Sequence, residues 1–515
     1  MTLDHGSNAA SSDLGDRASE LIEQGVAAAE AGDLDAALAA LEAGERLADE
    51  AGSAALVAAA RINKGFAHWV KGDATTACGF FAEGAQVARE AEDTPRLVSA
   101  LGNLATASKQ IGKWAEAIVA YQEYLLLVPD DPEALAGAHQ QCGLAYVPLE
   151  QFESALAHLE EAERIATEVD LTELVITARI NQGIVREREG EDELALPHYD
   201  AAAALARESG HSALAALAIE RQAQGLRRQS QFAEADPLFT EVEALYRSLG
   251  RESELASTLH RHALAFRGGG MRDRALATWR EEELIRRRLD QHDELGECLF
   301  EQAELLRERE EDAAAEGIYA QAAAAYRRGE SRRGLAETLG RHADLLRTQD
   351  RADEARALAD EALAAVVVVN APDTEARVRG VRAMLLADAG DTDAALLELD
   401  AAETAAISIG EHGLVTWLKA RRAYVFARAD RPVEDVAQQL GDAYAYGFDF
   451  ADGRTARRAV LTMIFEMKKW CSDECREALD AIRADIRTGK PAFGPETGPE
   501  SPESPESPES PSETD

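Results

Sequence analysis

The chain has 515 residues, of which 54 are basic and 95 acidic, so its formal charge is −41. This surplus of acid disfavours nucleic-acid binding, because nucleic-acid binders neutralise phosphates with Lys and Arg, and it disfavours an anionic membrane surface for the same reason. The sequence also lacks the run of roughly 20 apolar residues that a membrane-spanning helix requires.

The N-terminal segment, residues 1–15, has neither the basic nor the apolar region of a signal peptide. We predict that these residues are disordered and that the protein is cytoplasmic. The five cysteines are too few and too scattered to build a disulfide framework, which agrees with that location.

A repeat of about 40 residues begins near residue 16. An alanine marks each repeat, at intervals of 40 residues apart from one interval of 38. The marker alanines are Ala37, Ala77, Ala117, Ala155, Ala195, Ala235, Ala275, Ala315, Ala355 and Ala395. Gly or Ala stands twelve residues before every marker, and Leu or an aromatic residue stands four residues after nine of the ten.

Each repeat is predicted to be two helices around a short turn, which is plain at Gly32-Asp33. The small residues allow the two helix backbones to approach closely. The large residue after the marker is predicted to fill the gap against the next repeat. Pro197 and Pro237 lie two residues past their markers, so we expect a kink or a late start of the second helix there.

The second helices are predicted to end at residues that adopt a left-handed backbone easily. Seven of the ten repeats have such a residue fifteen positions after the marker: Gly52, Asp170, Gly210, Gly250, Asp290, Asn370 and Gly410. The other three repeats have Glu92, Pro132 and Glu330, so the helix boundary stays open there.

This arrangement of small residue, marker alanine and following aromatic residue resembles the tetratricopeptide repeat (TPR). The usual TPR period is about 34 residues, and the longer period is similar to kinesin light chain, to the Leu-Gly-Asn adaptors and to bacterial regulatory TPR arrays. The resemblance covers ten repeats, residues 16–410, although the Trp of the common first-helix pattern is absent. It implies an all-α fold, a right-handed superhelical α-solenoid.

The repeat fades after residue 410, where an eleventh first helix is followed by Asp435 in place of the marker. Helical patterns continue to residue 487, so 411–487 is predicted to be a degenerate repeat and a helical cap. Residues 488–515, with their repeated Glu-Ser-Pro, cannot bury a core and are predicted to be disordered. Two roles remain open for this acidic tail: autoinhibition of a basic surface, or solubility alone.

In the family that the sequence resembles, first helices line the inner groove. In the second repeat this face carries Ile62, Asn63, Phe66 and Trp69. The residues at the position of Asn63 in the next three repeats are Asn103, Gln141 and Asn181. An amide offers a donor and an acceptor together and so matches a peptide bond, and aromatic residues beside it can anchor side chains. The alternative is that Phe66 and Trp69 belong to the core.

Repeats six and seven place basic residues on the same face: Arg221, Arg227, Arg228, His260, Arg261 and Arg267. A planar guanidinium binds a carboxylate through two parallel hydrogen bonds, so this stretch is predicted to receive an acidic segment. Repeats eight and nine mix arginines with acids at helical spacing. Ion pairs within one helix, such as Asp344 with Arg347, predict a solvated salt-bridged face there.

The sequence contains no phosphate-binding loop, dinucleotide fingerprint, nucleophile elbow or HExxH motif. Cys471 and Cys475 share a helical face but have no histidine near them to complete a zinc site. We therefore predict a non-enzymatic scaffold, without metal or cofactor, that binds an extended segment of another protein. The alternative is a regulatory sensor that binds a small peptide or metabolite and changes superhelical shape to control an effector.

Overall fold

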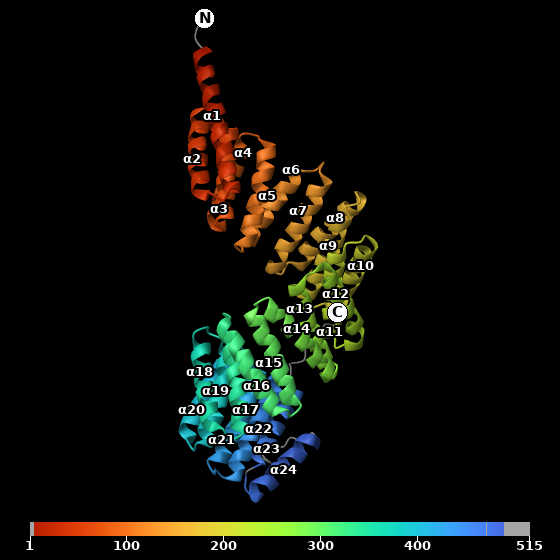
Figure 1. The fold of residues 1–515 in the computed structure, drawn as a ribbon, viewed down its shortest axis with the longest axis vertical. Helices are drawn as coiled ribbons and strands as arrows, with labels where there is room; N and C mark the ends of the chain where they lie inside the picture. Colours follow the sequence, from red (N-terminus) through yellow and green to blue (C-terminus); the bar gives the residue numbers. More distant parts are fainter. Residues whose placement is uncertain (1–4, 470, 489–515) are drawn as a thin grey trace, which may run out of the picture. The chain divides into compact units, whose positions relative to one another are not determined.

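The structure, a computed structural model, describes residues 5–469 and 471–488. These residues form helices in tandem antiparallel pairs, without a strand among them, as Figure 1 shows. The predicted fold class, an all-α solenoid of TPR-like helix pairs, is confirmed. The chain divides into two compact units, Met1–Ala275 and Leu276–Asp515, which we call the N-terminal and C-terminal units.

In the N-terminal unit the first helices are α1 (His5–Glu30), α3 (Ala54–Val70), α5 (Thr94–Gln110), α7 (Pro132–Tyr146), α9 (Thr172–Glu189), α11 (Ser212–Arg228) and α13 (Glu252–Gly268). The second helices are α2 (Leu34–Glu50), α4 (Ala74–Glu90), α6 (Trp114–Leu127), α8 (Phe152–Glu168), α10 (Asp192–Glu208) and α12 (Phe232–Leu249). A short 3-10 turn, Val147–Leu149, follows α7.

The division between the units falls in the first turn of α14 (Arg272–Arg288), the next second helix. In the C-terminal unit the first helices are α15 (His292–Glu308), α17 (Arg332–Thr348), α19 (Pro372–Asp388) and α21 (His412–Arg428). The second helices are α16 (Asp312–Arg328), α18 (Ala352–Val367), α20 (Thr392–Ser408) and α22 (Val433–Phe450), followed by α23 (Gly453–Met467) and α24 (Asp473–Thr488).

The ends of the chain differ from one prediction. Residues 5–15, which the sequence places in a disordered N-terminus, lie in helix α1, which begins at His5. Residues 1–4 and 489–515 lie outside the described residues. The predicted disorder of the tail therefore stays a prediction.

Most helices end at a residue with a left-handed backbone conformation, and these residues recur at regular intervals along the chain. All seven positions that the sequence marked after the second helices have positive φ, and so does Glu92, whose boundary was open. The turn inside each repeat has the same geometry, at Gly in most repeats but at residues such as Ser230 and Asp350 in others. The amide that follows bonds back to the helix, as Asp73 N does to His68 O at 2.9 Å, which satisfies a carbonyl of the last turn.

The two internal prolines leave their helices continuous. Helices α10 and α12 run through Pro197 and Pro237 and begin three residues before their marker alanines, as α2 and α4 also do. The late start expected at these prolines is therefore wrong.

The core of a repeat is the contact between its small and its large residue. Tyr199 of α10 is fully buried against Gly183 of α9, where an added Cβ would lie 2.5 Å from the Tyr199 ring. Gly65 and Phe81 meet in the same way in α3 and α4. The large residue thus packs inside its own repeat, which corrects the prediction that it fills the gap to the next one. Its ring fills the space that the missing side chain leaves.

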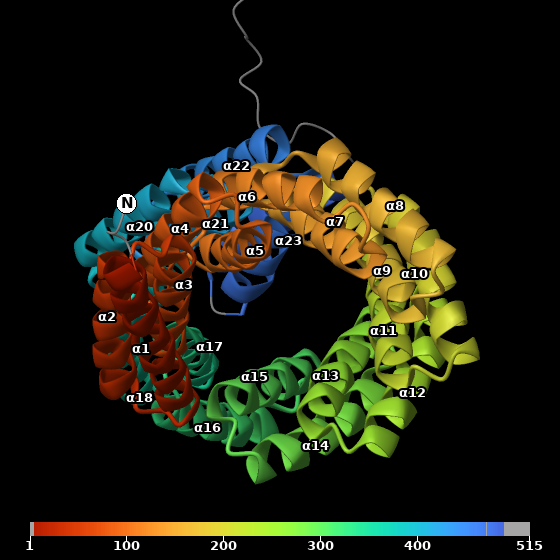
Figure 2. The same cartoon turned by 90° about the horizontal axis from the view of Figure 1, so that it is seen from above.

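First helices of successive repeats contact one another, for example α3 with α5, α11 with α13 and α17 with α19. Figure 2 shows them as an inner row within each unit. We call the side they present the first-helix face. None of the described helices combines the length and apolarity that crossing a membrane requires.

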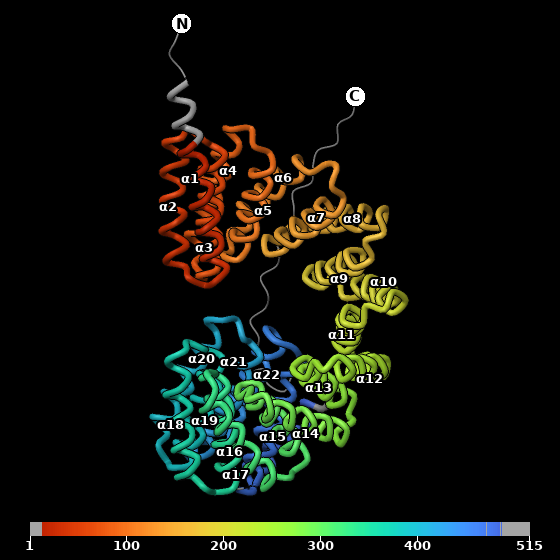
Figure 3. Tube along the Cα trace, turned by 45° about the horizontal axis from the view of Figure 1, so that its top comes forward, coloured from red at the N-terminus to blue at the C-terminus, as the bar shows by residue number. Residues whose placement is uncertain are grey.

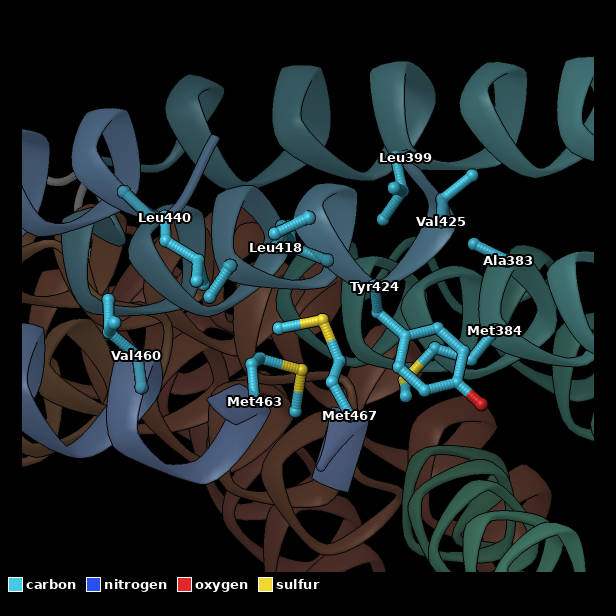
Figure 4. Packing of buried hydrophobic residues seen from close by; sticks show 14 of the residues in the cluster. Ala383, Met384, Leu399, Leu418, Tyr424, Val425, Leu440, Val460, Met463 and Met467 are labelled. Atoms are coloured by element: carbon cyan, nitrogen blue, oxygen red, sulfur yellow. The ribbon is translucent and has the colours of Figure 1, made fainter. Parts of the chain in front are cut away.

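The C-terminal unit ends in its largest apolar cluster. Figure 4 shows Met463 and Met467 of α23 close to Leu418 and Tyr424 of α21. Val460 of α23 and Leu440 of α22 belong to the same cluster. Helix α23 therefore covers apolar surface that α21 and α22 would otherwise expose.

We expect Gly183→Ala to lower the free energy of unfolding by about 1–3 kcal/mol, because the new methyl group overpacks the Tyr199 contact. Gly137→Ala in α7 is the matched control, since a Cβ there meets nothing within 4 Å. It should raise stability by up to about 1 kcal/mol through helix propensity. Urea unfolding followed by circular dichroism measures both changes, and equal effects would contradict this packing.

Candidate functional site

All the sequence-predicted site residues lie on first helices of the N-terminal unit, and all but Ile62 are at least partly exposed. They lie on α3, α5, α9, α11 and α13 of the N-terminal unit, and Figure 3 shows the order of these helices along the chain. The face has three sections: an apolar section on α3, an amide section from Asn63 of α3 to Asn181 of α9, and an arginine section on α11 and α13.

In the apolar section some of the predicted residues are exposed and others are buried. Phe66 is 43 % exposed and Val70 48 % exposed, so both offer apolar surface. Ile62 is only 7 % exposed and packs against Gly84 of α4, which assigns it to the core and corrects its place among the surface contacts. Trp69 is half-buried against the apolar cluster formed by α3 to α7.

The amide section holds two amides whose hydrogen-bonding groups are unused. Asn63 donates to the Ala59 carbonyl one turn earlier in its own helix, at 3.0 Å. Gln141 accepts a hydrogen bond from the Lys109 ammonium. Asn103 and Asn181 are half-buried and have no side-chain hydrogen bond to any residue that the structure describes.

Lys109 is a residue of this section that the sequence argument missed. It lies eight residues before its marker, the position that Arg227 and Arg267 occupy in later repeats. Burial lowers the pKa of Lys109. Its place in the repeat was the signal that could have identified it.

Acidic side chains of α9 and α10 form ion pairs with two of the predicted arginines. Arg228 lies 2.5 Å from Glu187 and 2.9 Å from Asp192. Arg221 is 4.0 Å from the same Glu187. Burial alone would lower the pKa of Arg228, but the two carboxylates outweigh it and raise that pKa.

A third arginine is held by a buried acid. Arg261 of α13 lies 2.5 Å from Glu220 of α11. Glu220 also accepts hydrogen bonds from Thr258 and Tyr246 at 3.0 and 3.4 Å, so its carboxylate is fully engaged. His260 and Arg267 are half-buried on the same helix, α13.

Arg227 is the exception in the arginine section. Its guanidinium forms neither an ion pair nor a hydrogen bond with the residues that the structure describes, and the buried Nε has no hydrogen-bond partner. Burial, followed by the positive charges of Arg228 and Arg261, lowers the pKa of Arg227. A half-buried cation next to two like charges is unfavourable, and a carboxylate would relieve it.

The C-terminal unit shows how the same position can be neutralised. Arg307 and Arg347 are the equivalents of Arg227, and Asp344 lies 2.7 Å from the first and 3.3 Å from the second. Burial alone would raise the pKa of Asp344, but these arginines outweigh it and hold that pKa well below its usual range. Where Asp344 stands, the repeats around Arg227 have Gln224 and Leu264.

This arrangement bears out the salt bridges predicted for repeats eight and nine but corrects the predicted solvation at Arg347, whereas Glu297 and Glu308 are exposed. Arg347 is buried and pairs with Asp388 at 3.4 Å and with Glu466 of α23. Most of these pairs join different helices, and only Asp344 with Arg347 matches a predicted pair within one helix.

The N-terminal unit also has a pocket among its second helices, which the sequence did not predict. It has a volume of about 610 Å³ and lies between α4 and α6, above α5. Small residues open it, among them Gly79, Ala82 and Ala115, and Val119 is exposed in its wall. Arg89 and Glu123, joined by an ion pair at 2.8 Å, also line it.

The described residues contain no group of three His, Cys, Asp or Glu side chains placed to hold a metal ion. Cys475 is buried in the apolar cluster of the C-terminal unit, and burial, with Cys471 adding to it, raises the pKa of its thiol to about 11.

No protein-family model matches the chain, and no curated protein matches it significantly. Among solved structures it is similar to the apo form of the quorum sensor NprR from B. thuringiensis, with 12 % identity over 69 % of this chain and 99 % of that one and a TM-score of 0.42. A tetratricopeptide repeat protein from Parabacteroides merdae has 18 % identity over 52 % and 93 %, with a TM-score of 0.37. A putative kinesin light chain with TPR-like repeats from Podosopora anserina has 15 % identity over 39 % and 99 %, with a TM-score of 0.35.

At these identities the likeness concerns the fold alone. The fold is that of an array of TPR-like helix pairs.

Replacing Arg227 should stabilise the protein, because Arg227→Met removes an unpaired, half-buried charge. Arg261→Met is the matched substitution with the opposite expectation, since it leaves buried Glu220 without its cation and should cost about 1–3 kcal/mol. The midpoints of urea unfolding compare the two variants with the parent chain. A loss of stability in Arg227→Met equal to that in Arg261→Met would show that Arg227 has a partner.

Proposed function

We propose that this protein is a non-enzymatic scaffold that binds an extended segment of a partner protein along the first-helix face of its N-terminal unit. The observation that carries the proposal is Arg227, a half-buried cation near Arg228 and Arg261 that has no acidic partner among the residues that the structure describes. An acidic side chain of the bound segment supplies the missing carboxylate. Function is a common reason for a protein to keep a local arrangement that lowers its stability.

The other two sections suit the same ligand. Asn103 and Asn181 have free donors and acceptors that match the backbone of an extended peptide. Phe66 and Val70 offer exposed apolar contacts at the other end of the face. The partner segment is therefore predicted to carry an apolar residue at one end and an acidic residue at the other, with a plain extended backbone between them.

Charge restricts the acidic contact to a short stretch. The chain as a whole carries −41, so it repels acidic partners at long range. The arginine section gathers the arginines of this face, so it is expected to attract an acidic segment over distances near the Debye length of about 8–10 Å. Affinity for the acidic end is expected to fall as the salt concentration rises.

Selection from a random peptide library displayed on phage tests the proposal with the full chain as the target. Selected peptides should share an acidic residue, and Arg227→Glu should weaken their binding by about 10-fold to 100-fold, as the loss of one charged hydrogen bond predicts. Arg164→Glu is the matched control, because Arg164 is an exposed arginine on the second helix α8.

Three outcomes would contradict the proposal: selected peptides without acidic residues, equal weakening by both variants, or binding that Arg227→Glu leaves unchanged. A separate pair, Asn103→Ala and Asn181→Ala, tests the amide section. Together these substitutions should weaken the same peptides by about 10-fold and leave the unfolding midpoint unchanged.

The regulatory sensor stays a prediction from the sequence. It uses the same face and adds a change of shape on binding. Small-angle scattering of the chain with and without a selected peptide separates the two, since a scaffold keeps its radius of gyration.

A further inference from the structure

An ion pair recurs between neighbouring second helices on their outer side. In each case an arginine twelve residues after the marker reaches an acid thirty-four residues further along. The pairs are Arg89 with Glu123 at 2.8 Å, Arg207 with Glu241 at 2.8 Å and Arg327 with Glu361 at 2.9 Å. All are partly exposed, so water faces this side of those helices.

This series of ion pairs ends within the C-terminal unit, after the pair of Arg327 with Glu361. Forty and eighty residues after Arg327, the equivalent positions hold Val367 on α18 and Ile407 on α20. Both side chains are more than half exposed. An outer position that holds an exposed arginine in five of the eight earlier repeats is therefore apolar here.

Neighbouring exposed apolar residues join Val367 and Ile407 in an apolar stripe. It crosses the C-terminal ends of three successive second helices, α18, α20 and α22, which Figures 2 and 3 show following one another in the C-terminal unit. Its members are Val367, Val368, Val369, Ile407, Ile409, Phe448 and Phe450. Their exposed fractions lie between 40 % for Val369 and 79 % for Val368.

The area of the stripe fits a stable dimer. These fractions correspond to roughly 700 Å² of exposed surface on apolar residues, taking about 150–220 Å² for a fully exposed residue of these types. The largest apolar patch of a typical monomer is about 300–600 Å². A standard interface buries about 800 Å² on each partner, and those between identical subunits are the more apolar ones.

We propose that the apolar stripe is the contact surface of a symmetric homodimer. Side-chain size increases along it, from Val on α18 through Ile on α20 to Phe on α22. A two-fold axis at α20 sets the small end of one copy against the large end of the other, so the gap between the copies stays even. A two-fold contact requires a surface that is complementary to itself in this way.

Charges beside the stripe give the dimer a distinct salt response. Asp449 lies between the two phenylalanines, and Glu411 follows Ile409 closely; both are exposed. Association of two strongly acidic chains brings such groups together, so it is opposed by repulsion that salt screens. Raising NaCl from about 50 to 500 mM should therefore tighten the dimer, whereas an interface held by ion pairs would weaken.

Sedimentation velocity of the full chain tests the proposal. The parent chain should sediment as a dimer of twice 55.5 kDa at micromolar concentration. The double variant Val368→Asp/Phe448→Asp should be a monomer, with dissociation at least roughly a hundredfold easier. The control is Leu284→Asp/Phe465→Asp, which places the same charge change on two equally exposed apolar residues outside the stripe and should remain a dimer.

A photo-crosslinking amino acid at position 448 identifies what covers the stripe. In a mixture of light and heavy isotope-labelled chains, cross-links should join different chains and reach the end of α18. Cross-links within one chain, to the N-terminal unit or to residues 489–515, would overturn the proposal. A monomeric parent chain, a dimeric stripe variant, or a control that dissociates like the stripe variant would overturn it as well.

Discussion

The fold depends on one contact, between a residue without a large side chain on the first helix and a large side chain on the second. At Gly183 and Tyr199 this contact leaves no room even for a methyl group. It fixes how closely the two helices of a repeat approach. Because the contact recurs every 40 residues, it sets equivalent positions of successive repeats side by side. Columns of equivalent residues, rather than single residues, are thus the surfaces on which function can develop.

One such column explains why the two units differ. Arg227 and Arg347 occupy the same position of their repeats, and the residue three positions earlier decides the outcome. In the C-terminal unit it is Asp344, which neutralises the column, and Glu466 of α23 adds a further acid. In the N-terminal unit it is Gln224, so the cation remains uncompensated. The fold is the same in both, and the loss of a few acidic neighbours changes a structural ion-pair network into a candidate binding site.

The sequence predicted the repeat, the helix pairs and the left-handed ends well, because each depends on local residue size and backbone preference. Its predictions were wrong where tertiary contacts determine the burial or the pairing of a side chain. The burial of Ile62 and Arg347 and the pairing of arginines across helices depend on how neighbouring helices lie, which periodicity does not record. Left-handed turns at Ser230 and Asp350 went unnoticed because such residues are usual in other conformations too. The arginine section was predicted as a group, but only the structure distinguishes Arg227 from its paired neighbours.

Arg227 is proposed to be left uncompensated for a carboxylate that a bound peptide supplies. A crystal structure of the full chain with a selected acidic peptide tests it most directly. We expect a peptide carboxylate oxygen about 3 Å from the Arg227 guanidinium. The peptide backbone should run past Asn181 on the first-helix face. A peptide bound in the pocket between α4 and α6, with Arg227 still without a partner, would contradict it.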